Sequence, residues 1–171
     1  RKVTDLVDAQ ALVAGAAHTC ALRAEGKVSC WGAGDKGQLG DGGGKSSNIP
    51  VEVTGLQGVS ALAAGSEHTC ALVDDALHCW GANDSGQLGS SGGSGSAKPV
   101  ALEGLSGVKG VAAGGGTTCA QVADDKVLCW GDNGAGQLGT GTDKPSSPDP
   151  VAIVFPEPVV VQADAGPVDA G

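Results

Sequence analysis

Small and apolar residues in the first third of the chain fall into four short segments, at 11–16, 18–23, 27–32 and 50–55, separated by polar and glycine-rich stretches. No stretch repeats apolar residues every three or four positions, as an amphipathic helix would. The 31 glycines also argue against helices, because each glycine in a helix costs about 1 kcal/mol relative to alanine. The pattern therefore predicts short strands joined by turns, and an all-β fold.

This pattern recurs three times, with a period of about fifty residues. His-Thr-Cys-Ala-Leu begins at His18 and again at His68, and a divergent copy begins at Thr117. Four strands per repeat are typical of a β-propeller blade, whereas a β-sandwich does not need glycine motifs at fixed spacing. We therefore expect three four-stranded antiparallel blades, at about 1–52, 53–100 and 101–150. Residues 151–171 are expected to form an extended tail or linker that begins like a further blade.

A second motif follows in every repeat: Cys-Trp-Gly, then four intervening residues, then Gly-Gln-Leu-Gly. The tryptophans lie 49 and 50 positions apart, and a periodic tryptophan favours packing between blades over a sugar-binding platform. We assign a structural role to these repeated positions: Trp31, Trp80, Trp130, Gly37, Gln38, Leu39, Gly40, Gly86, Gln87, Leu88, Gly89, Gly136, Gln137, Leu138 and Gly139.

The six cysteines form one pair per repeat, with separations of 10, 9 and 10 residues. If the two cysteines of a pair face each other across a hairpin, the first loop has three residues, 24–26, and the second has two, Asp74 and Asp75. The second loop is shorter by one residue, which matches the shorter separation of its cysteines, so the cysteines stay opposite each other. Directly opposed residues of a hairpin lie close enough to form a disulfide. We expect the disulfides Cys20–Cys30, Cys70–Cys79 and Cys119–Cys129.

Two alternatives for the cysteines remain open, namely buried free thiols and a zinc site. The absence of any Cys-x-x-Cys sequence argues against zinc. Persistent disulfides would place the protein in an oxidising compartment.

The motifs together resemble the repeat of the regulator of chromosome condensation family over roughly residues 3–151. The resemblance implies a propeller of about seven four-stranded blades, and three repeats cannot close such a ring alone. We therefore expect a partial propeller that other chains or missing repeats complete. It is closest to a bacterial, extracytoplasmic, cysteine-containing branch. Thr117 departs from the pattern by replacing the histidine of the repeat, which indicates that His18 and His68 are structural.

Charge and motif content restrict the function further. A net charge of −9 argues against binding nucleic acid or anionic membranes, and no apolar stretch is long enough to span a membrane. No nucleophile–base pair, phosphate-binding loop or calcium-loop spacing is present, so we expect no enzyme activity, cofactor or metal. Asp35, Asp84 and Asp132, which follow the Trp-Gly pairs, are expected to bond their own turns.

The sequence favours a non-catalytic scaffold that binds protein partners or other copies of itself, located outside the cytoplasm of a bacterium: in the periplasm, on the cell surface or in the medium. Its variable segments 41–48 and 90–98 are the expected binding loops, with Asp41, Lys45, Asn48, Ser90, Ser94 and Lys98 as candidate residues. The alternatives implied by the family are a guanine-nucleotide exchange factor for a small GTPase and a secreted enzyme inhibitor. The scarcity of aromatic residues argues against the inhibitor.

Overall fold

The computed structural model describes residues 6–90 and 93–155, and this part of the chain is built from β-strands with two short 3₁₀ turns. The strands form three separate four-stranded antiparallel sheets, so the predicted all-β blades are confirmed. The strands are β1 (Ala9–Ala14), β2 (His18–Arg23), β3 (Val28–Gly32), β4 (Ser47–Glu52), β5 (Val59–Ala64), β6 (His68–Val73), β7 (Ala76–Gly81), β8 (Ser96–Ala101), β9 (Gly110–Gly114), β10 (Thr117–Gln121), β11 (Val127–Asp132) and β12 (Ser146–Ala152).

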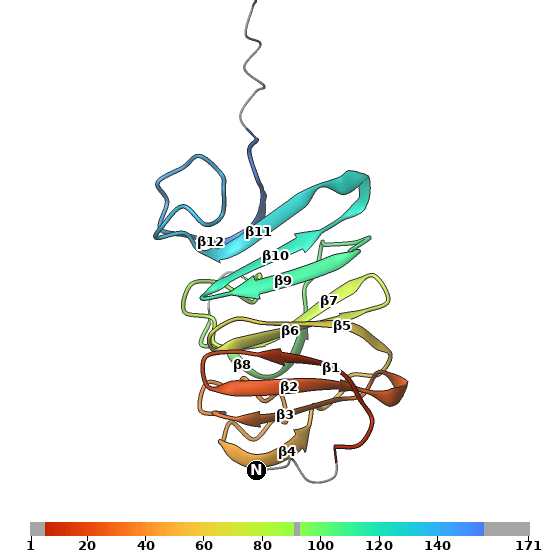
Figure 1. Ribbon diagram of the computed structural model, residues 1–171. Coiled ribbons are helices and arrows are strands. Elements are labelled where there is room, and N and C mark those ends of the chain that lie inside the picture. Colours follow the sequence, from red (N-terminus) through yellow and green to blue (C-terminus); the bar gives the residue numbers. More distant parts are fainter. Residues whose placement is uncertain (1–5, 91–92, 156–171) are drawn as a thin grey trace, which may run out of the picture.

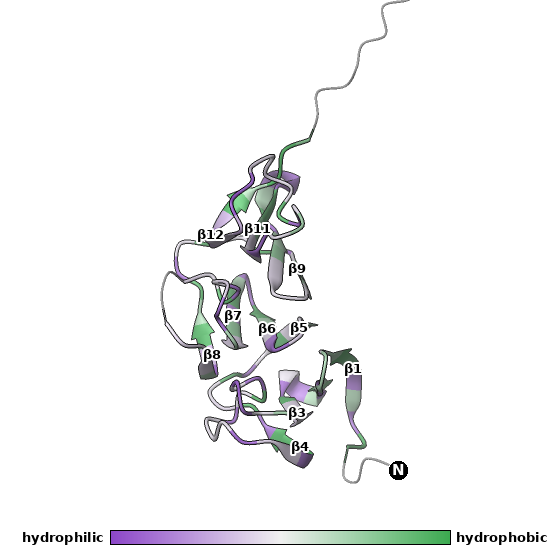
Figure 2. Cartoon of the chain, turned by 90° about the vertical axis from the view of Figure 1, so that its left-hand side faces the viewer, coloured by the Kyte–Doolittle hydropathy of each residue, from purple (hydrophilic) through white to green (hydrophobic). Residues whose placement is uncertain are grey.

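Each sheet follows the order of its strands in the sequence, and the three sheets lie one after another along the array (Figure 1). The first strands of neighbouring blades, β1, β5 and β9, lie close to one another along one side of the array. The fourth strands, β4, β8 and β12, lie along the opposite side (Figure 2). The described residues therefore form an arc of three blades. No helix in the described part is long and apolar enough to cross a membrane.

The hairpin at the centre of each blade has the register that the cysteines predicted. Cys20 faces Cys30, Cys70 faces Cys79 and Cys119 faces Cys129. The three-residue loop of the first hairpin contains Glu25 and Gly26 in the left-handed conformation, with φ of 59° and 68°. Loop length thus absorbs the difference in spacing, because the two-residue loop Asp74–Asp75 joins Val73 directly to its partner Ala76.

The fourth strands of the first two blades begin earlier than the sequence predicted, since β4 begins at Ser47 and β8 at Ser96. The first blade uses Ser47–Glu52 in place of 50–55, and its first strand is Ala9–Ala14 in place of 11–16. Pro50 lies inside β4, which pairs with β3 on one side only. A proline can occupy such an outer strand where its missing N–H would have faced away from the sheet.

The end of the third blade also differs from the prediction made from the sequence, which placed residue 151 at the start of a tail. Val151 and Ala152 complete β12 and pair with Cys129 and Leu128 of β11, so they belong to the third blade and do not open another. The expected tail strand from 151 to 161 lies outside the described residues beyond Phe155.

Two hydrophobic clusters hold the three blades together, and each lies between neighbouring blades. The first joins Cys20, Cys30 and Leu22 of the first blade to Ala71 and Trp80 of the second. The second repeats this arrangement one blade further on, from the Cys70–Cys79 pair to Ala120 and Trp130. Each sheet therefore has two distinct faces: its cysteines face the next blade, and its tryptophan faces the previous one.

Candidate functional site

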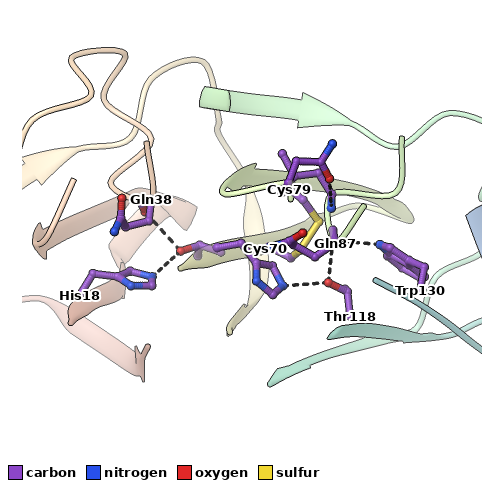
Figure 3. Close-up of a disulfide and its surroundings, with 11 residues drawn as sticks. His18, Gln38, Cys70, Cys79, Gln87, Thr118 and Trp130 are labelled. Carbon is purple, nitrogen blue, oxygen red and sulfur yellow. Dashed lines mark hydrogen bonds between the residues drawn. A yellow bond between two sulfur atoms is a disulfide. The ribbon is translucent and has the colours of Figure 1, made fainter. Parts of the chain in front are cut away.

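The Gly-Gln-Leu-Gly motif of one blade binds the tryptophan of the next blade. The backbone carbonyl of Gln38 accepts a hydrogen bond from Trp80 Nε1 at 2.9 Å and another from Thr69 Oγ1 at 3.3 Å. The carbonyl of Gln87 accepts the same pair one blade on, from Trp130 Nε1 at 3.0 Å and Thr118 Oγ1 at 2.8 Å (Figure 3). A single carbonyl thus aligns each pair of blades.

The glutamine side chain shapes the turn that presents this carbonyl. Gln38 Oε1 accepts a hydrogen bond from the backbone N–H of Lys36, and Gln87 Oε1 accepts one from that of Ser85, both at 2.9 Å. Glycine is required at the end of the motif, since a Cβ on Gly40 would lie 2.7 Å from Trp80 Nε1 and its φ is +69°. The motif therefore serves turn geometry and close packing between blades.

The repeated histidines complete each junction. His18 Nε2 lies 2.8 Å from Thr69 Oγ1, and His68 Nε2 lies 2.8 Å from Thr118 Oγ1. Since the threonine hydroxyl already donates its hydrogen to the glutamine carbonyl, the imidazole Nε2–H must be the donor. The buried Nδ1 of each of these two histidines has no hydrogen-bond partner among the described residues, which fits a neutral ring with no proton on that atom.

These surroundings disfavour the charged form of both histidines. Burial lowers the pKa of His18, and burial together with the nearby His18 lowers the pKa of His68 to about 4. Protonation of His68 would add a buried charge and an unpaired N–H donor at Nδ1. The histidines therefore act as neutral hydrogen-bond donors between blades.

The depressed pKa of His68 predicts a pH-dependent stability. In the unfolded chain His68 takes up a proton near pH 6.5, whereas in the folded chain it does so only near pH 4. The contribution of neutral His68 to the free energy of unfolding is therefore complete above pH 6.5 and is lost as the pH falls toward 4. The full loss is on the order of 3 kcal/mol. Denaturant unfolding of the wild type and of His68→Thr should give a stability difference that narrows between pH 7.5 and pH 4.5. A difference that stays constant over this range would contradict the role given to His68.

The three cysteine pairs are disulfide-bonded, with Cα atoms 4.1 Å apart in each pair, and the structure contains no free cysteine. Cys20–Cys30 and Cys70–Cys79 are fully buried in the two junctions. Cys119–Cys129 lies on the face of the third blade that no described residue covers, and Cys119 is partly exposed there.

The loops that join the third and fourth strands gather along one rim of the arc, opposite the hairpin turns that join the second and third strands (Figure 1). The first of these loops contacts the start of the second blade's fourth strand, since Gly42 N–H donates to Ala97 O in β8 at 2.8 Å. Beside this contact, an open hollow of about 270 Å³ is lined by Asp35, Lys36, Gly37, Gly44, Ala82, Asn83, Asp84, Ser94, Gly95 and Ala97. Lys36 Nζ and Asp84 Oδ2 lie 3.7 Å apart across it.

The predicted binding residues divide between loop and strand. Lys45, Ser90 and Ser94 are exposed in the rim loops, and Asp41 is half-buried, with its Oδ1 accepting from Gly43 N–H at 2.9 Å. Asn48 and Lys98 were expected in loops, but they lie in β4 and β8 because these outer strands begin earlier than predicted.

The aspartates after the Trp-Gly pairs have separate roles. Asp132 bonds its own turn, since its Oδ1 accepts from Gly134 N–H at 3.1 Å. Asp84 instead pairs with Lys36 of the neighbouring blade. Within the described residues, no group of three or more histidine, cysteine, aspartate or glutamate side chains is placed to hold a metal ion.

Sequence reasoning missed two parts of this arrangement. The Lys36–Asp84 pair between blades left no signal, because Lys36 is not repeated: Ser85 and Ala135 stand at its position. The threonine of each junction did leave one: Thr19, Thr69 and Thr118 all precede the first cysteine of their repeats. A polar residue kept at one strand position in every repeat points to a recurring hydrogen bond.

Comparisons with known proteins agree with this geometry. One sequence model of the regulator of chromosome condensation (RCC1) repeat matches residues 25–72, 74–121 and 124–167, and a second matches 10–38, 59–87 and 108–137. No protein matches the chain among the curated proteins.

Solved structures show the same arrangement of blades. Human WBSCR16 is similar with a TM-score of 0.79 and 27% identity, over 90% of this chain and 40% of that one. Prp20p of Saccharomyces cerevisiae is similar with a TM-score of 0.75 and 27% identity, over 91% and 38%. A chain in the structure of Kap60 bound to yeast RCC1 (Prp20) has a TM-score of 0.76 and 25% identity, over 91% and 37%.

The chain thus spans about two fifths of the length of these structures. The repeat models match most of its residues, and the junctions account for the tryptophan, the glutamine and the final glycine of the motifs. The protein belongs to the regulator of chromosome condensation (RCC1) repeat family.

Proposed function

We propose that this protein is a non-catalytic, extracytoplasmic scaffold that binds a protein partner through its rim loops. The observation that supports this most is the hollow between the first two loops, where exposed polar residues surround a cation and an anion. Protein partners are recognised well by adaptable polar loops on a rigid frame, and the buried junctions provide that frame.

The disulfides support the location outside the cytoplasm, since such bonds persist where thiols are not kept reduced. Protein binding also has precedent among the similar structures. Yeast RCC1 was solved bound to Kap60, and the structure of Prp20p was described together with its binding to Gsp1p and histones. Because this chain spans only part of those proteins, their partners are not assigned to it.

A guanine-nucleotide exchange factor is the alternative function that the family suggests. It would work inside the cell with reduced cysteines, and the bonded pairs argue against that setting. An enzyme inhibitor with an aromatic contact surface is disfavoured by the two rim loops, since neither 41–46 nor 90–95 contains an aromatic residue.

Site-specific cross-linking tests the proposed rim. A photo-reactive amino acid is placed at Lys45 or Ser94 on the rim, and at Glu25 or Asp124 on the opposite hairpin turns as matched exposed controls. In the native host, both rim positions should cross-link to the same protein, and both control positions should not. Equal cross-linking from the hairpin turns, or none from the rim, would contradict the proposal.

A further inference from the structure

The fourth strand of every blade has an open outer edge. Within the described residues, β4, β8 and β12 each pair with one strand only, and they lie along the same side of the array (Figure 2). The second blade has a described blade on each side, and β8 still pairs only with β7. The open edge is therefore a property of each blade and does not depend on neighbouring blades. The unpaired N–H and C=O groups of such an edge are a template on which another strand can add.

A Ser-x-x-Pro-Val motif recurs at this edge, at residues 47–51, 96–100 and 147–151. In the first blade Val51 faces Cys30 and Ser47 faces Gly32, so four steps along β4 match two steps along β3. The same irregularity recurs in the second and third blades. Each fourth strand is therefore interrupted by a bulge within the motif, and its edge is irregular there.

The serine of the motif occupies backbone groups that an added strand would need. Ser47 Oγ donates to Ile49 O at 2.6 Å and accepts from Ile49 N–H at 3.3 Å. Ser96 Oγ makes the same two bonds to Lys98, at 2.7 and 3.2 Å. In the third blade, Ser147 Oγ donates to the carbonyl two residues further on, at 2.8 Å. The third position of the motif thus has an occupied carbonyl in every blade, and an occupied N–H in the first two.

The proline removes the next donor along the edge. In an antiparallel pair, the backbone groups of successive residues point alternately toward the partner strand and away from it. Val53 N–H donates to Val28 O at 3.0 Å, so this alternation points the nitrogen of Pro50 away from the sheet. The corresponding bond of Leu102 in the second blade, at 2.8 Å, places Pro99 in the same way. A proline nitrogen carries no hydrogen, so the edge lacks a donor at this position.

We propose that the Ser-x-x-Pro motif closes the outer edge of each blade against strand addition by another copy of this chain. An adding strand would meet a bulge, an occupied carbonyl and a missing donor in succession. The first blade depends on the motif most, because Ile49 is 60% exposed where the other blades carry the exposed charges of Lys98 and Asp149. Charged side chains also oppose pairing at an edge, whereas an exposed isoleucine favours it. This inference does not rest on the rim proposal.

Sedimentation velocity of the wild type and of Ser47→Ala/Pro50→Val tests the motif. The double variant frees the backbone of Ile49 and restores a donor beside it. It should associate at a concentration at least about tenfold lower than the wild type, and infrared spectra should show the band of intermolecular β-sheet. Adding Ile49→Lys to this variant should reverse most of the association, because it places a charge on the freed edge.

Ser96→Ala/Pro99→Val makes the same change in the second blade, where Lys98 remains, and should associate less than the first-blade variant. Ser94→Ala/Pro145→Val is the matched control, since it makes the same two kinds of substitution at exposed positions outside the fourth strands, and it should behave like the wild type. A first-blade variant that associates no more than the wild type would overturn the proposal. Association that persists after Ile49→Lys, or that the control variant shares, would also overturn it, because misfolding and not edge pairing would then be the cause.

Discussion

Reduction of the three disulfides is expected to unfold the protein at temperatures where the oxidised form is fully folded. Each bridge closes a loop of about ten residues and contributes about 2–3 kcal/mol, so that three bridges approach the whole stability of a small domain. The core has little to replace them, since the chain contains three tryptophans, one phenylalanine and no tyrosine. Urea unfolding with and without a phosphine reductant measures the effect.

The bridges should not contribute equally. Replacing Cys70 and Cys79 by alanine removes a bridge that is fully buried against the third blade. Replacing Cys119 and Cys129 removes one that is partly exposed, and this pair serves as the matched control. Both variants lose the loop constraint, but only the first also leaves a gap in a junction, so it should be the less stable of the two. An unchanged unfolding midpoint after full reduction would contradict this account of stability.

Trp80→Ala is expected to destabilise the protein by about 3–5 kcal/mol, the cost of emptying a large buried site. Trp80 has no exposed surface, packs in the first junction and donates to the Gln38 carbonyl. Trp31→Ala is a natural control, because Trp31 occupies the same position in its repeat but is only half-buried on the outer face of the first blade.

The control variant should therefore lose much less stability than Trp80→Ala when both are unfolded as monomers at low concentration. A third variant, Trp80→Phe, keeps most of the packing but removes the Nε1 donor. It should lower the free energy of unfolding by about 1 kcal/mol for the lost hydrogen bond, and further for the smaller ring. Equal losses from Trp31→Ala and Trp80→Ala would show that the tryptophans stabilise blades and not junctions.

The hairpins were predictable from the sequence because their information is local. The spacing of Cys20 and Cys30, with Gly26 between them, defines a loop length and hence a register. The repeated Trp and Gly-Gln-Leu-Gly motifs identified the blades. Both junctions use the same hydrogen bond from a tryptophan to a glutamine carbonyl, so the same residues recur in each repeat.

The remaining features depend on neighbouring blades, and local patterns do not encode them. The bond from His18 to Thr69 joins residues 51 positions apart, and either residue alone has several plausible roles. The start of β4 was misplaced because Pro50 reads as a strand boundary, while an outer strand tolerates it. The hydrogen bond from Gly42 of the first rim loop to Ala97 of β8 likewise follows only from how the blades pack.

The oxidation state of the cysteines in the native protein tests the central claim. This claim is that each RCC1-type blade is cross-linked by a disulfide and that the protein works in an oxidising compartment. The chain is isolated from its host into a denaturing buffer that contains an alkylating reagent, without reductant, and its intact mass is measured. The account predicts that none of the six cysteines is alkylated, and that a peptide map shows only Cys20–Cys30, Cys70–Cys79 and Cys119–Cys129. Six alkylated cysteines would contradict it and favour an intracellular exchange factor.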